Sequence, residues 1–279
     1  MDSTIDSGCI EWYPIRQLLG YPGYEFTLIV LNQPIQDPAL FNDLWNAAST
    51  KIAADGGANQ IYDFSKQSQV ANGDTNPNPH DQYRDLDTII GDLDSLRPES
   101  RAHFAPHTHI IHEADQYSTD FGKAVRLARR EAPGRDLICL GGLGGRVDQG
   151  LSQLHHLYLF QKSPTYADGR VFLVSGDSLS FVLKGGQRHR IHVREPGLRV
   201  VGRTTTHVHL DYTEPFSKYV GIVPVGDKAV ISTKGLEWDV RDWPTEFGGQ
   251  MSTSNHVLPE TTVVEVCTDK DVLFTIAMK

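Results

Sequence analysis

The stretch IIGDLDSLRPES, residues 89–100, places two carboxylates, Asp92 and Asp94, one residue apart directly after an apolar run. A short run of β-branched and apolar residues is typical of a strand buried on both faces, as in a parallel sheet covered by helices. Like charges a few ångströms apart repel and push one pKa upward, so something must offset the repulsion. The stretch therefore predicts a buried strand with a charged, compensated loop at its carboxyl end.

Similar apolar runs lie on both sides of this stretch, and segments with helical spacing separate them. Strands that alternate with helices predict an open, doubly wound, mostly parallel α/β domain, which we place at residues 26–177. The other runs are FTLIVL (26–31), KIAA (51–54), HIIH (109–112), DLICL (136–140) and RVFLV (170–174).

Helices are expected at 38–49, 118–131 and 147–160, where apolar residues recur at helical spacing. In the second of these, a Ser or Thr at the start suits an N-cap. In the third, the apolar stripe consists of Val147, Leu151, Leu154 and Tyr158.

From about residue 178 the pattern changes to strand-like runs separated by Gly, Pro and Asp turns, among them LRVVGRTTTHVHLDY at 198–212. This pattern predicts an antiparallel β domain over residues 178–279. The polar stretch 65–85 is expected to be a mobile loop or insertion. Residues 1–25 form an N-terminal extension without a predicted fold.

Composition limits the functions to consider. The chain has 279 residues and a formal net charge of −9, which argues against broad nucleic-acid binding through phosphate neutralisation. Cys9, Cys139 and Cys267 leave one cysteine unpaired in any disulfide scheme, which fits a reducing compartment. The start lacks an apolar signal core and the apolar runs are too short to span a membrane. We expect a cytoplasmic protein.

Clusters of Gly, Asp and Ser follow five of the predicted strands. Ligands of open α/β sheets bind beyond the carboxyl ends of the strands, so these clusters should share one rim. Each cluster alone has a plain structural interpretation, such as Asp92 and Asp94 capping a turn. Four acidic clusters beside the Gly-rich loop that carries Arg146 favour Mg²⁺ and phosphate instead. The clusters begin at Asp55, Gly91, Asp115, Gly141 and Ser175.

Seven motifs resemble the thiamine pyrophosphokinase family in order and spacing over residues 26–279. The resemblance implies an N-terminal α/β domain, a C-terminal β-sandwich and a homodimer with active sites at the subunit interface. It also implies transfer of pyrophosphate from ATP to thiamine, giving thiamine diphosphate and AMP. The motifs are ADGGAN (54–59), GDLDS (91–95), DQYSTDFGKA (115–124), GGLGGRVDQ (141–149), GIVPVG (221–226), TKGLEWDV (233–240) and STSN (252–255).

The resemblance also assigns roles to acidic and basic residues. Asp92, Asp94, Asp115 and Asp120 correspond to the positions that hold Mg²⁺, and Asp92, Asp94, Asp120 and Arg146 to the catalytic positions. Mg²⁺ and Arg146 would neutralise charge on the transferred group. A carboxylate could accept the proton of the thiamine hydroxyl, and Asp120 and Asp92 both remain candidates.

Substrate-binding positions follow in the same way. Trp238 could cover a ring of thiamine by a cation–π contact, or it could be a core residue of the β domain. The expected thiamine-binding residues are Trp238, Ser252, Ser254 and Asn255. The expected nucleotide-binding residues are Asp55, Gly56, Gly57, Gln116, Thr119, Gly144, Arg146, Asp148 and Ser175.

Two other functions stay open. A metal-dependent transferase could use Asp92-Leu93-Asp94 as a DxD motif, although this leaves the STSN and GLEW motifs unexplained. A protein that binds nucleotide or thiamine without catalysis is the second alternative. The stretches 65–85 and 203–218 are longer than in compact family members, so they leave oligomer details and regulation open.

Overall fold

The structure is a computed structural model that describes residues 8–72, 83–198 and 215–279. The chain forms two compact units. The β unit comprises residues 1–21, 163–165 and 177–279, and the α/β unit comprises residues 22–162 and 166–176. Among the described residues, no helix has the length and apolar character needed to cross a membrane.

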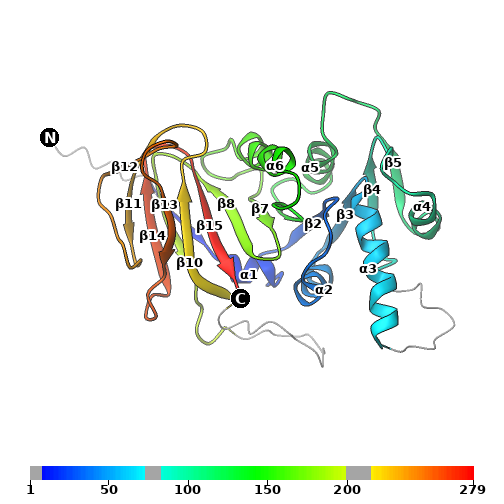
Figure 1. The fold of residues 1–279 in the computed structure, drawn as a ribbon, viewed down its shortest axis with the longest axis horizontal. Coiled ribbons are helices and arrows are strands. Elements are labelled where there is room, and N and C mark those ends of the chain that lie inside the picture. Colours follow the sequence, from blue (N-terminus) through cyan, green and yellow to red (C-terminus); the bar gives the residue numbers. More distant parts are fainter. Residues whose placement is uncertain (1–7, 73–82, 199–214) are drawn as a thin grey trace. The chain divides into compact units, whose positions relative to one another are not determined.

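The strands of the α/β unit lie where the apolar runs predict them. Neighbouring strands pair in parallel, in the order β7-β6-β2-β3-β4-β5 (Figure 1). The predicted doubly wound, mostly parallel sheet is therefore confirmed. The strands are β2 (Phe26–Val30), β3 (Thr50–Ala54), β4 (Thr88–Gly91), β5 (His109–His112), β6 (Asp136–Leu140) and β7 (Val171–Val174).

Helices connect these strands. Right-handed crossovers place α2, α3 and α4 on one face of the sheet and α5 and α6 on the other. The Asp37 side chain caps α2 by accepting from the N–H groups of Ala39 and Leu40. The helices are α2 (Pro38–Ala47), α3 (Gly57–Asn72), α4 (Pro98–Phe104), α5 (Asp120–Glu131) and α6 (Val147–Phe160).

The order of the strands creates a switch point between β2 and β6. From β2 the chain proceeds outward through β3 and β4 to β5, and then returns to the other side of β2 as β6. At such a point the loops after the two central strands turn apart and leave a crevice at the carboxyl edge. The predicted site residues of the α/β unit lie along this edge.

One local prediction was wrong, and one helix was predicted with its bounds but without its buried face. The expected loop at 65–85 is helical up to Asn72, since its first residues contain neither Gly nor Pro, and 73–82 lie outside the described residues. The stripe of α6 is not its buried face, because Val147 and Leu151 are 78% and 60% exposed. The buried side chains of α6 include Gln153, His156 and Leu157.

The β unit contains a five-stranded sheet of order β1-β9-β14-β11-β12 and four strands of a second sheet, in the order β13-β10-β15-β8. The described strands of this unit pair antiparallel, except that β1 pairs in parallel with β9. Most of the predicted 198–212 strand and most of the 203–218 stretch lie outside the described residues. The elements are β1 (Cys9–Trp12), α1 (Pro14–Leu18), β8 (Ser178–Leu183), β9 (Gln187–His192), β10 (Phe216–Val223), β11 (Ala229–Lys234), β12 (Trp243–Thr245), β13 (Ser252–His256), β14 (Val263–Thr268) and β15 (Val272–Met278).

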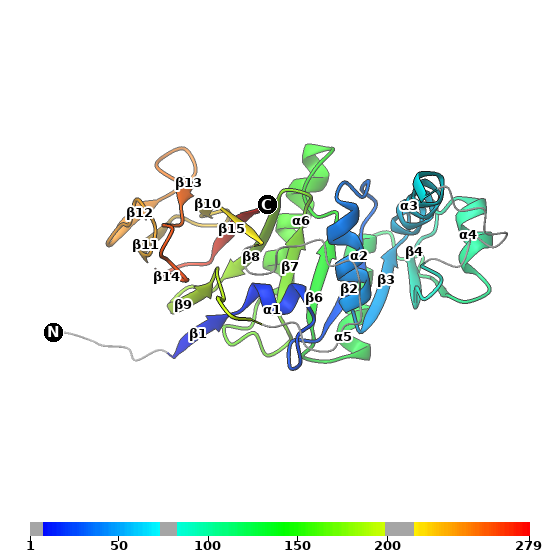
Figure 2. The same ribbon diagram turned by 90° about the horizontal axis from the view of Figure 1, so that it is seen from below.

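Aromatic rings join the two sheets into a sandwich. Trp12 of β1 stacks on Phe181 of β8 with ring centroids 4.4 Å apart, and Phe181 contacts Phe274 of β15. The indole N–H of Trp12 donates to Nδ1 of His189 at 3.1 Å. Part of the N-terminal stretch thus belongs to the β unit as a strand and a core aromatic residue, as Figure 2 shows for β1 beside β9.

Candidate functional site

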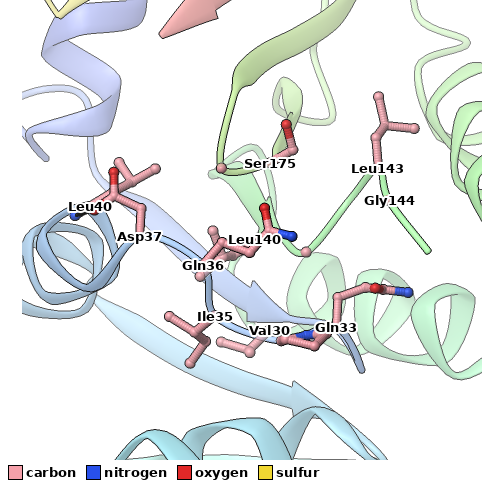
Figure 3. A pocket seen from close by; sticks show the side chains of 13 residues that line it. Val30, Gln33, Ile35, Gln36, Asp37, Leu40, Leu140, Leu143, Gly144 and Ser175 are labelled. Carbon is pink, nitrogen blue, oxygen red and sulfur yellow. Dashed lines mark hydrogen bonds between the residues drawn. The ribbon is translucent and has the colours of Figure 1, made fainter. Parts of the chain in front are cut away.

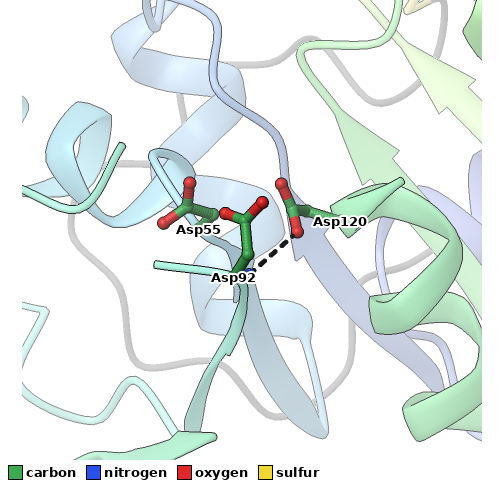
Figure 4. A group of neighbouring side chains, drawn as sticks. All are labelled: Asp55, Asp92 and Asp120. Atoms are coloured by element: carbon green, nitrogen blue, oxygen red, sulfur yellow. Dashed lines mark hydrogen bonds between the residues drawn. The ribbon is translucent and has the colours of Figure 1, made fainter. Parts of the chain in front are cut away.

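Three carboxylates meet at the carboxyl edge of the parallel sheet. Asp55 follows β3, Asp92 follows β4 and Asp120 opens α5. One oxygen from each lies within 4.8 Å of the others (Figure 4). Adjacent parallel strands end at the same edge, so residues far apart in the sequence are brought together here. We call Asp55, Asp92 and Asp120 the carboxylate group.

Asp55 is the most constrained member of the carboxylate group. Its side chain is buried, and its backbone φ of 42° is uncommon for a residue other than glycine. Its Oδ2 accepts from the Ser95 N–H, whereas its Oδ1 is buried without a hydrogen-bond partner among the described residues. Burial raises the pKa of the Asp55 carboxyl, and the charges of Asp120 and Asp92 add to the rise.

The loop after β4 holds Asp92 against this group. The backbone N–H of Asp92 donates to Oδ1 of Asp120 at 3.2 Å, as the dashed line in Figure 4 shows. The Asp92 carboxylate accepts from the Asp94 N–H and from the Gln116 amide. These hydrogen bonds, led by the one from Asp94, hold the pKa of Asp92 below its usual range.

A buried lysine supplies part of the missing positive charge. Lys123 lies one turn into α5, is 1% exposed and places Nζ 3.0 Å from Oδ1 of Asp120. The sequence predicted repulsion between Asp92 and Asp94. In the structure the close carboxylates are instead Asp55, Asp92 and Asp120, and Lys123 offsets part of their charge. Sequence reasoning did not single out Lys123, although a lysine within an apolar helix stripe is a usable signal.

A cleft of about 570 Å³ opens over the carboxylate group. Its lining includes much of the residue set that the sequence assigned to catalysis and nucleotide binding. The predicted residues that line it are Asp55, Gly56, Asp92, Gln116, Thr119, Asp120 and Arg146.

Asp94 and Asp115 lie outside the carboxylate group. The Asp94 carboxylate accepts from the Ser95 hydroxyl at 2.9 Å. The Asp115 carboxylate accepts from the Ser118 hydroxyl at 2.6 Å and from the Tyr117 N–H at 2.9 Å. Both therefore act in local turns of the described structure.

Arg146 and Asp148 pair with each other at the start of α6. The guanidinium donates to both carboxylate oxygens, at 3.0 Å from Nε and 2.5 Å from Nη2. Both side chains are exposed, and the hydrogen bonds from Arg146 lower the pKa of Asp148. The fork that would fit a phosphate is thus occupied by Asp148 here.

A second, smaller cavity lies at the switch point, beyond β2 and β6 (Figure 3). Gly144 and Ser175 line it together with Gln33 and Gln36. Its volume of about 30 Å³ is close to that of one water molecule. Gly144 and Ser175 thus line this smaller cavity, which shares Gln33 with the large cleft.

The four predicted thiamine residues lie in the β unit. Trp238 is 55% exposed, so it is not a core residue of the described β unit. Buried Asn255 holds the backbone of Trp238: its Oδ1 accepts from the Trp238 N–H at 3.1 Å, and its Nδ2 donates to the Trp238 carbonyl at 3.0 Å. Ser252 and Ser254 lie on β13 beside it. Asn255 therefore positions the loop that presents the exposed indole ring.

Two further polar residues support the site, and the sequence analysis did not assign them a role. Asn59 holds the loop after β4, donating to the Ser95 carbonyl at 2.7 Å and accepting from the Arg97 N–H at 3.1 Å. His156 of α6 contacts the Thr119 hydroxyl at 2.8 Å. Asn59 belongs to the ADGGAN motif, whereas His156 belongs to no motif that the sequence analysis quoted.

Family models match both parts of the chain. The model of the thiamin pyrophosphokinase catalytic domain matches residues 41–167. The model of the thiamin pyrophosphokinase vitamin B1 binding domain matches residues 205–273. The first match includes the whole carboxylate group, and the second includes Trp238 and Asn255.

Whole-chain relatives agree with these matches. Thiamine pyrophosphokinase 3 of Oryza sativa subsp. japonica is 32% identical over 265 residues, covering 92% of this chain and 88% of the relative. Thiamine pyrophosphokinase 1 of Arabidopsis thaliana is 32% identical with the same coverage. The crystal structure of yeast thiamin pyrophosphokinase has a TM-score of 0.79 at 22% identity and covers 100% of this chain and 94% of that one, so the folds are alike.

Proposed function

This chain belongs to the thiamin pyrophosphokinase family, and we propose that it transfers pyrophosphate from ATP to thiamine, giving thiamine diphosphate and AMP. The observation that carries the proposal is the carboxylate group at the rim of a parallel sheet, inside the region that matches the catalytic domain. Carboxylates at this edge suit a nucleotide phosphate that arrives with a hard cation.

The carboxylate group fits Mg²⁺. Carboxylate oxygens are the ligands that this ion prefers, and the buried Oδ1 of Asp55 has no hydrogen-bond partner among the described residues. We assign Asp55, Asp92 and Asp120 as its ligands. Asp94 and Asp115 remain candidates for contacts through water, because Mg²⁺ usually keeps several waters. When bound, Mg²⁺ would neutralise phosphate charge in the transition state.

The chain's own residues would position the reactants. Arg146 would exchange its contact with Asp148 for phosphate oxygens, which a planar guanidinium binds with two parallel hydrogen bonds. Asp92 and Asp120 both lie in the cleft and both stay candidates for accepting the proton of the thiamine hydroxyl.

We further propose that thiamine binds to the β unit of a second copy in a homodimer. The exposed indole of Trp238 would cover a ring of the cationic substrate, with Ser252, Ser254 and Asn255 around it. Tyr117, which lines the cleft, is fully exposed, and the exposed Val147 directly follows the cleft residue Arg146. Apolar side chains beside a polar cleft favour a covering protein surface.

Incubation of the purified protein with ATP, Mg²⁺ and thiamine, followed by identification of the products, tests the proposed reaction. AMP and thiamine diphosphate are expected in equal amounts. Asp92→Asn should lower turnover by at least ~10²-fold with the fold retained. Turnover of a nucleotide-sugar would favour the DxD transferase instead, and binding without turnover would favour a sensing protein.

Cytoplasmic location is part of the proposal. The described cysteines Cys9, Cys139 and Cys267 are free thiols, which agrees with a reducing compartment. Fluorescence microscopy of the tagged full-length chain would test this location, and signal confined to a secretory organelle would contradict it.

A further inference from the structure

We propose that His156 is a positioning residue that fixes the first turn of α5 through Thr119 and thereby keeps Asp120 in the carboxylate group. This inference rests on the proposed function of that group. His156 touches none of the three carboxylates in the described contacts, and none of the motifs used above includes it. Its effect on the site would pass through the hydrogen bond to Thr119, the N-cap of α5.

The hydrogen bonds of the imidazole ring have one consistent direction. Nδ1 lies 2.6 Å from the Ser152 carbonyl oxygen, which can only accept, so Nδ1 carries the proton. In the neutral ring Nε2 is then an acceptor, and the Thr119 hydroxyl donates to it at 2.8 Å. The same hydroxyl accepts from the Gly122 N–H at 3.1 Å and so caps α5.

The ring of His156 is held firmly in this orientation. The side chain is 7% exposed, and its ring centroid lies 5.4 Å from that of Phe121 and 5.9 Å from that of Phe160. A methyl group on Gly122 would lie 3.5 Å from Nε2, so the ring sits directly against the first turn of α5. Packing thus fixes the acceptor that determines where the Thr119 hydroxyl points.

Asp120 is the residue that follows this cap. Its Oδ1 receives both the Asp92 N–H and the Lys123 ammonium, so its position links the loop after β4 to α5. If Nε2 is lost, the Thr119 hydroxyl can rotate, and the cap holds the first turn less firmly. The three carboxylates would then be less well preorganised for a cation.

The test is calorimetric titration of the full-length protein with Mn²⁺, used as a probe for the metal site, without nucleotide or thiamine. His156→Phe keeps an aromatic ring but removes the acceptor, and its affinity should be roughly three- to tenfold weaker, as for loss of one neutral hydrogen bond. His156→Gln, which retains an acceptor, should recover part of the affinity. His155→Phe on the neighbouring exposed position is the matched control and should bind as the wild type does.

A double-mutant cycle separates positioning from general destabilisation. Thr119→Val should weaken Mn²⁺ binding less in the His156→Phe background than in the wild type, because both changes remove the same bond. Additive effects, or wild-type affinity of His156→Phe, would overturn the inference while the metal site stands. If the wild type binds no Mn²⁺, the proposed metal site fails and the inference fails with it. Should His156→Phe not fold, the same cycle with His156→Leu, which also lacks an acceptor, applies.

Discussion

At the scale of single residues, the carboxylate group contains features that destabilise the folded protein when no cation is bound. Asp55 combines a positive φ, burial and an unpartnered oxygen, and only Lys123 lies close enough to pair with Asp120 among the described contacts. Unfavourable conformations of this kind are common at functional sites, where the rest of the fold is stable enough to hold them in place. Removal of one charge should therefore stabilise the protein and abolish its activity.

Asp55→Asn tests this expectation. The folded-state pKa of Asp55 is raised, so its favourable contribution is complete below the unfolded value of 3.8 and is lost as the pH rises through the folded pKa. At neutral pH the ionised form is a net destabilisation, and Asn also tolerates positive φ. We expect Tm to rise by about 2–4 °C without Mg²⁺, activity to be lost and the rise of Tm with added Mg²⁺ to disappear.

Asp227→Asn is the control for removing one negative charge, because Asp227 is exposed in the loop between β10 and β11. Its Tm should differ from that of the wild type by no more than about one degree. A fall in the Tm of Asp55→Asn would mean that the ionised carboxylate is stabilising in the protein without metal.

Gly91 tests how closely the carboxylates approach one another. A methyl group on its Cα would lie 2.7 Å from Cβ of Asp55 and 3.0 Å from Oδ1 of Asp120. Gly91→Ala should therefore separate these residues, with a loss of stability of about 1–3 kcal/mol and a loss of Mg²⁺-dependent activity. Gly8→Ala, where no atom lies within 4 Å, is the control. Wild-type activity of Gly91→Ala would show that this contact is not needed.

At the scale of elements, the sequence predicted the parallel strands closely. A short, unbroken apolar run is typical of a strand that is buried on both faces of a parallel sheet. The sequence also predicted the bounds of α6, but not its buried face: the stripe at Val147 and Leu151 is exposed, whereas Gln153 and His156 are buried. Periodicity identifies an apolar face but not what covers it. The contact between Thr119 and His156 joins residues 37 positions apart, so local patterns could not reveal it.

The contact between α5 and α6 should respond to acid. Burial lowers the pKa of His156, and the charged groups that face it are Arg126 of α5 and His155 of α6. Its stabilising contribution is therefore present above the unfolded pKa of 6.5 and is lost as the pH falls through the folded value. Between pH 8 and 5, the free energy of unfolding should fall more steeply for the wild type than for His156→Phe. Parallel curves for the two proteins would contradict this prediction.

At the scale of the whole molecule, the two units carry different parts of the proposed chemistry. The cleft of the α/β unit collects carboxylates, amides and Arg146, whereas the exposed aromatic residue expected to bind thiamine belongs to the β unit. The sequence singled out Asp55, Asp92, Asp120 and Arg146 because each follows a predicted strand, whereas Trp238 was proposed from the family resemblance. The sequence could not show which carboxylates lie close together. Asp94 and Asp115 stand in the same motifs as Asp92 and Asp120, but they lie outside the carboxylate group.

The proposed homodimer makes a quantitative prediction about mixed protein. Asp92→Asn removes a function of the α/β unit, and Trp238→Ala removes one of the β unit, so each homodimer should be inactive. If every site combines the α/β unit of one chain with the β unit of the other, each mixed dimer contains one intact site. Dissociation and random reassociation of equal amounts should then restore about a quarter of wild-type activity. Mass spectrometry under native conditions would count the mixed dimers. Mixed dimers without activity would mean that each site takes both units from one chain.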